Sequence, residues 1–133
     1  MTSPAPQQIP VRLRLAVLWA SLTFCYLYGD YFGLYRPGKL QHMLDGAGPV
    51  GPASQASLLL VSALLMIPGL MVALSVVLPR PFARWLSIGL AAFFALFVAL
   101  TLPGAWWFYL MYSTVEIILC LSIAWSAWRW PRE

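Results

Sequence analysis

Four long apolar runs dominate the pattern of hydrophobic and polar positions along this chain. Each run has at least 21 residues, and a helix of about 20 residues crosses roughly 30 Å of hydrocarbon. We therefore predict transmembrane helices over the ranges 13–34, 54–78, 82–102 and 106–128. Because the connections after the second and third runs are very short, consecutive helices are expected to lie antiparallel as neighbours. The predicted fold class is all-α, a four-transmembrane-helix antiparallel bundle.

The segments outside the apolar runs predict little further structure. Residues 1–12 are polar and rich in proline, which indicates a flexible tail. The longest connection, residues 35–53, contains the stretch GKLQHMLDG, which can form two helical turns with its apolar residues on one side. This pattern predicts a short interfacial helix that rests on lipid or caps the bundle. Residues 13–130 are expected to form a single membrane domain.

The second apolar run is interrupted in its middle by Pro68-Gly69. A proline inside a helix removes one backbone hydrogen bond and bends the helix, and membrane helices tolerate this better than soluble ones. We interpret the pair as a packing kink in preference to a gating hinge.

Composition also indicates a membrane protein. Hydrophobic residues make up 62% of the 133 residues and charged residues only 9%, with a mean hydropathy of +0.80, whereas a soluble domain has roughly 25% charged residues. The net charge of +4 comes from basic residues placed between the apolar runs. This placement is typical of topology signals and gives no support for nucleic-acid binding, so membrane lipid is the expected partner.

The basic residues predict the orientation in the membrane by the positive-inside rule. An inside amino terminus places six arginines in the cytoplasm and leaves only Arg36 and Lys39 outside. Both termini are therefore expected to be cytoplasmic. The six arginines are Arg12, Arg14, Arg80, Arg84, Arg129 and Arg132.

Two of the four acidic residues, Asp30 and Glu116, lie within apolar runs. A carboxylate that faces lipid is costly, so acids in membrane helices usually face the bundle interior. Each of the two shares a helix face with hydroxyl and aromatic side chains, which predicts a ligand-binding cavity between the first and fourth helices. The candidate residues are Trp19, Thr23, Tyr26 and Asp30 in the first run, Tyr109, Tyr112, Ser113 and Glu116 in the fourth, and Arg36 just beyond the first.

The two acids are expected to have different surroundings. Asp30 lies near the outer end of its helix, where Arg36 is the first candidate for an ion pair and Lys39 the second. Glu116 lies near the bilayer centre with no basic residue at its depth, so we expect a protonated carboxyl group that is hydrogen-bonded to a tyrosine or serine. An architectural role stays open for both, because hydrogen bonds between membrane helices contribute roughly 0.6–2 kcal/mol each.

Other chemistries find no support in the sequence. Cys25 and Cys120 point in different directions on their helices and form no Cys-x-x-Cys motif. His42 is the only histidine, which is too few for a zinc site or for haem held by two histidines. We therefore predict no metal, no cofactor and no catalytic residues. A membrane enzyme that acts on lipid or quinone is the least favoured alternative.

Several short motifs together resemble a family of small, uncharacterised bacterial four-helix integral membrane proteins. They include the Tyr26/Asp30 end of the first run, "RPG" at Arg36 to Gly38, "LLMIP" at Leu64 to Pro68, Glu116-Ile117, and "WSAW" at Trp125 to Trp128. The resemblance covers about residues 13–130, and the arrangement is similar in outline to DoxX-type proteins. It implies a multi-pass protein of the bacterial inner membrane, and the family carries no assigned activity.

These observations lead to two hypotheses about function. In the first, the acidic cavity opens toward the outer face and binds or moves a small cationic or amphipathic ligand. Glu116 is then the titrating group, Asp30 attracts or orients the ligand, and Arg36 acts as a gate. In the second, the protein is a non-catalytic structural or accessory subunit that packs with a membrane partner protein or with itself as a homo-oligomer.

Overall fold

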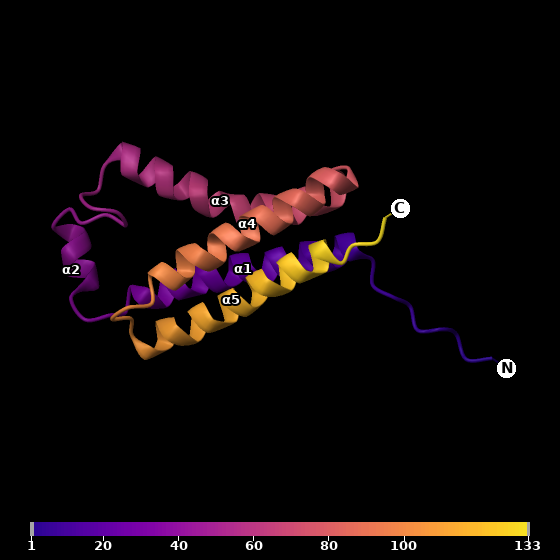
Figure 1. Ribbon diagram of the computed structural model, residues 1–133. Coiled ribbons are helices and arrows are strands. Elements are labelled where there is room, and N and C mark those ends of the chain that lie inside the picture. Colours follow the sequence, from indigo (N-terminus) through magenta and orange to yellow (C-terminus); the bar gives the residue numbers. More distant parts are fainter. Residues whose placement is uncertain (1, 133) are drawn as a thin grey trace.

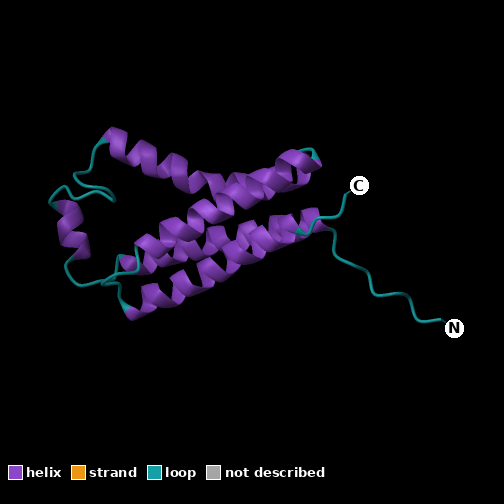
Figure 2. Ribbon diagram, in the orientation of Figure 1, coloured by secondary structure: helices purple, strands orange, loops and turns teal. Residues whose placement is uncertain are grey.

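The computed structural model describes residues 2–132, and this part of the chain contains five α-helices and no β-strand (Figure 1, Figure 2). The helices are α1 (Val11–Gly33), α2 (Lys39–Leu44), α3 (Gln55–Val77), α4 (Arg80–Leu100) and α5 (Trp107–Trp128). The four longer ones are long and apolar enough to cross a membrane. The all-helical fold with four membrane helices is thus confirmed, and their bounds differ from the predicted ranges by no more than two residues.

Proline and serine determine where the helices begin. α1 starts directly after Pro10, so it includes Arg12, which the sequence had assigned to the tail. Ser54 and Ser57 form a reciprocal capping box at the start of α3, which satisfies two N–H groups that lack partners inside the helix. Pro81 lies in the first turn of α4, where no backbone N–H donor is needed. These starts are therefore encoded locally.

The long helices follow one another around the bundle in the order α3, α1, α5 and α4. α1 packs along α3 and α5, and α5 packs along α4, whereas α3 and α4 meet at fewer positions. Figure 1 shows that α3 changes direction near its middle, so that its first half diverges from the other long helices. The bundle is consequently compact at the end that carries the termini and splayed at the opposite end, hereafter the splayed end.

Side chains from all four long helices form the core. Trp19 of α1 is fully buried, and its indole N–H donates to the hydroxyl oxygen of Ser87 in α4 at 3.4 Å. Met71 of α3, Phe94 of α4 and Ile123 of α5 are equally buried. Because lipid tails are as apolar as these side chains, the core stabilises the bundle by close packing and hydrogen bonding more than by exclusion of water.

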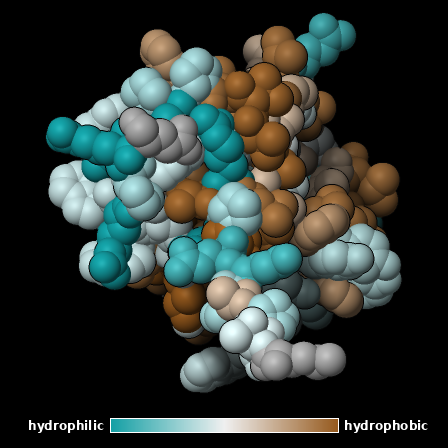
Figure 3. Space-filling model, turned by 90° about the vertical axis from the view of Figure 1, so that its right-hand side faces the viewer, coloured by the Kyte–Doolittle hydropathy of each residue, from teal (hydrophilic) through white to brown (hydrophobic). Residues whose placement is uncertain are grey.

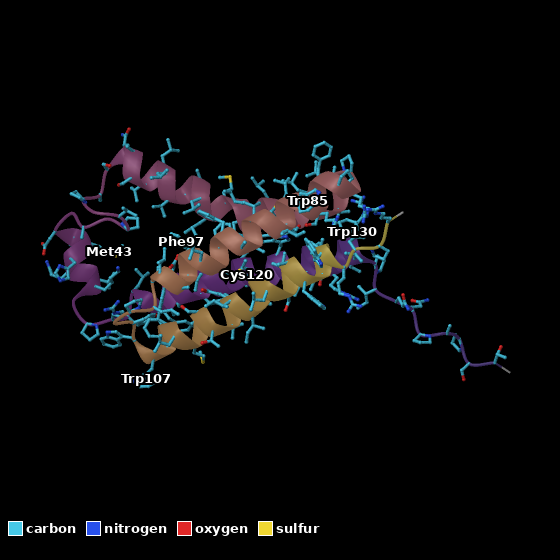
Figure 4. All side chains as sticks on the ribbon, viewed as in Figure 1. Met43, Trp85, Phe97, Trp107, Cys120 and Trp130 are labelled. Carbon is cyan, nitrogen blue, oxygen red and sulfur yellow. The ribbon has the colours of Figure 1, made fainter. Side chains whose placement is uncertain are left out.

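Arginine and tryptophan side chains cover the end of the bundle where the termini lie. A single nitrogen of Arg12 donates to three carbonyl oxygens at the end of α3, with a shortest distance of 2.6 Å. Arg80 and Arg84 donate in the same way to carbonyl oxygens at the end of α5. Such carbonyls lack partners inside the helix and attract cations. Figure 4 marks this end, hereafter the arginine end, by Trp85 and Trp130.

The splayed end carries α2 and a tight loop. α2 lies where the short helix was predicted. The following residues, 46–53, fold back on themselves through two backbone hydrogen bonds of 2.7 and 2.8 Å. A Cβ on Gly48 would lie 2.9 Å from the Cα of Ala53, so only glycine fits this turn. Residues 46–53 thus form a compact hairpin-like loop with Pro49 and Val50 at its tip.

Candidate functional site

A cavity of about 420 Å³ lies between the first half of α3 and the other long helices. It reaches from the tip of the 46–53 loop to the middle of α5, and both membrane acids line it. Its lining comprises Tyr26, Gly29 and Asp30 of α1, Pro49 and Val50 of the loop, Leu60, Val61, Leu64 and Leu65 of α3, Phe97, Val98 and Thr101 at α4, and Tyr109 and Glu116 of α5. The structure therefore brings together Tyr26, Asp30, Tyr109 and Glu116 from the predicted set.

The bend in α3 creates the space for this cavity. Pro68 has no N–H to donate to the carbonyl oxygen of Leu64 one turn earlier, and its ring distorts that turn. Residues of α3 before Pro68 line the cavity, whereas Met71 after it belongs to the core. The proline interpreted from the sequence as a packing kink is also the feature that separates the cavity wall from the packed half of α3 (Figure 1).

Glu116 is positioned where α1 and α5 approach closely. A Cβ on Gly29 would lie 3.9 Å from Oε1 of Glu116 and 3.8 Å from Cγ of Tyr112, so the glycine leaves room for the carboxyl group. Only 5% of Glu116 is exposed. The hydroxyl groups of Tyr26 and Ser113 are buried without a hydrogen-bond partner among residues 2–132. The hydrogen bond expected from these two neighbours to Glu116 is therefore not formed.

Asp30 lies nearer the splayed end, on an exposed part of the cavity lining. The predicted ion pair between Asp30 and Arg36 is wrong. The guanidinium carbon of Arg36 lies over the ring of Trp106 instead, 5.1 Å from its centroid. Arg36 lies three residues beyond the end of α1, so the periodicity of this helix does not direct its side chain toward Asp30. Arg36 instead lines a separate groove of about 470 Å³. The residue predicted to gate the cavity is thus absent from its lining.

Two tyrosines form the neutral polar part of the cavity wall. The hydroxyl oxygens of Tyr109 and Thr101 lie 3.0 Å apart in a hydrogen bond that links α5 to the end of α4. The ring of Tyr26 packs against Phe94 with their centroids 5.8 Å apart, and its hydroxyl is the unpartnered one described above. Leaving a buried hydroxyl unpaired costs about 1–3 kcal/mol. Because this hydroxyl is buried, the ring of Tyr26, and not its hydroxyl group, forms this part of the cavity wall.

Four other candidates lie outside the cavity. Trp19 is part of the core, and the Thr23 hydroxyl donates to the Trp19 carbonyl oxygen in its own helix at 2.8 Å. Ser113 is fully buried, and Tyr112 lines the groove that contains Arg36. The predicted polar faces run from the core to the splayed end, and only the part beside the divergent half of α3 borders the cavity.

Half of the cavity wall comes from α3 and α4, which the sequence did not predict. Thr101 carried a usable signal, because it is a hydroxyl side chain that follows thirteen apolar or glycine residues at the end of the third run. The leucine-rich wall of α3 carried none, since apolar residues of a membrane helix look alike whether they face lipid or a cavity. Only Pro68 indicated that this helix would diverge.

The only side chains lining the cavity that can carry a charge at neutral pH are acidic. Its only ionisable groups apart from the two tyrosines are the carboxyl groups of Asp30 and Glu116, and no lysine, arginine or histidine of residues 2–132 lines it. The rest of the lining is aromatic or aliphatic, apart from Thr101. No three potential metal ligands cluster in the part of the chain that the structure describes. The arrangement can hold an organic cation beside the carboxyl groups and an apolar body against α3.

Comparison with known proteins places the chain in a family but assigns no activity. Residues 10–133 match a protein family described as a family of unknown function (DUF6326). No curated protein and no solved structure matches the chain. The resemblance to an uncharacterised family is thereby confirmed, and the function has to be argued from the geometry of the site.

Proposed function

Since the chain belongs to this family of unknown function, DUF6326, we propose from its geometry that it is a membrane protein that binds a small organic cation or cationic amphipathic molecule. The observation that carries the proposal is that Asp30 and Glu116 line one cavity whose lining includes no lysine, arginine or histidine of residues 2–132, since Lys39 acts on Asp30 only from outside the lining. Charges of one sign in a cleft with low-dielectric walls concentrate the opposite charge there. A cation is therefore the ligand that complements this cavity.

The size and lining of the cavity narrow the class of ligand. Its volume of about 420 Å³ lies within the range of roughly 300–1,000 Å³ found for small-molecule sites. Tyr26, Phe97 and Tyr109 supply aromatic rings, which attract quaternary ammonium groups through cation–π interactions. The leucines of α3 offer an apolar surface on the other side. A positive head group on a compact apolar body fits both halves.

The acids lack the contacts that a purely architectural role requires. Polar residues that join membrane helices do so through hydrogen bonds between helices, as Tyr109 and Thr101 do here. Asp30 and Glu116 form no side-chain hydrogen bond within residues 2–132. The absence of such bonds at the two acids favours ligand binding over the alternative, in which Asp30 and Glu116 only join the helices of an accessory subunit.

The direction from which a ligand enters follows from the orientation of the protein. We place the arginine end in the cytoplasm by the positive-inside rule, in a bacterial inner membrane, which leaves the splayed end on the outer side. The cavity then has Pro49 and Val50 at its outer mouth and ends at Glu116. Core side chains such as Trp19 and Ile123 fill the bundle beyond it. Binding from the outer side is thus the activity proposed, without passage through the bundle.

Binding of benzyltrimethylammonium to the detergent-solubilised protein tests this proposal. Isothermal titration calorimetry is expected to detect binding to the wild type, and an excess of neopentylbenzene, the neutral analogue of the same shape, is expected not to displace it. At a pH where Glu116 is ionised, Glu116→Gln should weaken the affinity about 10- to 100-fold, because a carboxylate about 4 Å from the cation attracts it by roughly 1–4 kcal/mol.

The matched control is Asp45→Asn, which removes a carboxyl group next to α2 and outside the cavity. It is expected to bind the cation with wild-type affinity. Equal affinities for wild type and Glu116→Gln, with helicity preserved by circular dichroism, would contradict the proposal. Co-purification of a partner protein together with absent cation binding would favour the accessory-subunit alternative.

A further inference from the structure

A second pocket lies at the arginine end, remote from the acidic cavity. It has a volume of about 350 Å³ and lies between the residues that precede α1 and the end of α5. Its lining includes Gln8, Arg14, Trp125, Ser126 and Arg129, all of which carry N–H or O–H donors. Figure 3 looks onto this end of the molecule and shows hydrophilic residues gathered beside the hydrophobic flank of the bundle.

Five of the arginines at this end fall into two groups. Arg12, Arg80 and Arg84 donate to backbone carbonyl oxygens and complete α3 and α5. Arg14 and Arg129 form no side-chain hydrogen bond and no ion pair within residues 2–132, and both line the pocket. A guanidinium group keeps its charge at any physiological pH. Two permanent positive charges therefore border one pocket, and no acidic side chain of residues 2–132 lines it.

Arg129 is oriented by its neighbour. Its guanidinium carbon lies 5.2 Å over the ring of Trp125, an arrangement that leaves the N–H groups at the edge of the guanidinium plane available. Paired N–H donors of arginine match two oxygens of a phosphate group. Arg14, on another helix, borders the same pocket, so the two side chains can hold one anion between them. Ser126 adds a neutral donor to the set.

The position of the pocket identifies the source of the phosphate. α1 and α5 are membrane helices, and Trp125 and Trp128 are exposed at the end of α5, where tryptophan marks the boundary between hydrocarbon and head groups. Basic pockets between membrane helices bind anionic lipid head groups. We propose that this pocket binds the phosphate group of an anionic membrane lipid between Arg14 and Arg129.

Native mass spectrometry of the purified protein in detergent containing equal amounts of phosphatidylglycerol and phosphatidylcholine tests the proposal. The wild type is expected to retain phosphatidylglycerol preferentially. Each basic residue near a membrane surface contributes roughly a fivefold preference for anionic lipid, so Arg14→Gln with Arg129→Gln should reduce the preference about 25-fold. Arg14→Lys with Arg129→Lys, which keeps both charges, should retain most of it.

Two controls separate this pocket from general charge and from free phosphate. Arg36→Gln with Lys39→Gln removes the same charge from the splayed end and is expected to leave the preference unchanged. Inorganic phosphate at millimolar concentration is expected not to displace the lipid. The proposal is overturned if the wild type shows no preference, if both glutamine pairs lose it equally, or if inorganic phosphate alone occupies the pocket.

Discussion

The arginine end and the acidic cavity differ in whether their polar side chains have hydrogen-bond partners. At the arginine end, Arg12 and Arg84 donate to the free carbonyl oxygens of neighbouring helices. In the cavity beside the divergent half of α3, the carboxyl groups of Asp30 and Glu116 form no side-chain hydrogen bond within residues 2–132. An unsatisfied polar group in a membrane protein costs several kcal/mol. Arg12 and Arg84 therefore stabilise the arginine end, whereas Asp30 and Glu116 are carboxyl groups whose partners a ligand in the cavity can supply.

Of the variants that test this contrast, Arg12→Met is expected to change the unfolding free energy most. This substitution keeps the length of the side chain and removes its charge. It deletes the donor to three carbonyl oxygens of α3 and the cation–π contact with Trp130, in which the guanidinium carbon is 5.2 Å from the ring centroid. We expect a loss of about 2–4 kcal/mol of unfolding free energy, from about 1.5–3 for a charged hydrogen bond and about 0.5–1 for the cation–π contact. Denaturant titration followed by circular dichroism measures it.

Arg14→Met is the control in the same helix. Its side chain makes no hydrogen bond within residues 2–132, so in a detergent free of anionic lipid we expect a change within about 0.5 kcal/mol, as for other surface substitutions. If both variants lose the same stability, the arginine end is held by net charge and the specific caps contribute nothing.

The fold was predictable because its signals are local and strong. Four apolar runs bounded by proline, arginine and short turns allow few arrangements in a bilayer, and Ser54 and Pro81 mark helix starts in the sequence itself. The roles of Arg12 and Arg84 were not predictable. The positive-inside rule predicts a side of the membrane for them, but it does not predict their acceptors, which are carbonyl oxygens of helices 63 to 66 and 43 to 44 residues away.

The site was predictable in part for a related reason. Helical periodicity placed the acids on faces of α1 and α5 that do meet, so Asp30 and Glu116 were found together. Helical periodicity predicts the direction in which a side chain points. It does not predict whether that side chain meets a cavity or a packed core. Trp19 and Ser113 share those faces but lie in packed regions, and Arg36 follows the end of α1 and turns to Trp106.

Pro68→Ala is expected to change the unfolding free energy less than Arg12→Met does. It tests whether the bend in α3 creates the cavity. Alanine restores the N–H donor that the turn lacks, so α3 should straighten and approach α4. Proline in a helix interior costs about 3 kcal/mol relative to alanine in soluble hosts, and part of this is offset by lost packing of the buried ring, which leaves an expected gain of about 1–2 kcal/mol. The affinity for benzyltrimethylammonium should fall at least about tenfold as the cavity narrows.

Pro81→Ala is the matched control for this variant. Pro81 lies in the first turn of α4, where proline costs nothing, so neither stability nor affinity should change appreciably. A more stable Pro68→Ala protein that still binds the cation with wild-type affinity would show that the bend is a packing feature and that the cavity does not depend on it.

The smallest effect on stability is expected at Gly29, and it separates the shape of the cavity from its charge. A Cβ at this position would meet Tyr112 and Glu116 at ordinary van der Waals distances of 3.8 and 3.9 Å. Gly29→Ala should therefore change the unfolding free energy by less than about 1 kcal/mol, in the stabilising direction that helix propensity favours, and should bind the cation nearly as well as the wild type.

Gly29→Leu adds three more carbons toward the cavity and should abolish calorimetric binding while both carboxyl groups remain. Gly89→Leu is its control, because a Cβ there meets nothing within 4 Å, and it should leave binding intact. If Gly29→Leu still binds with wild-type affinity, the cation does not occupy the space beside Glu116, and the contrast between the two ends describes stability alone.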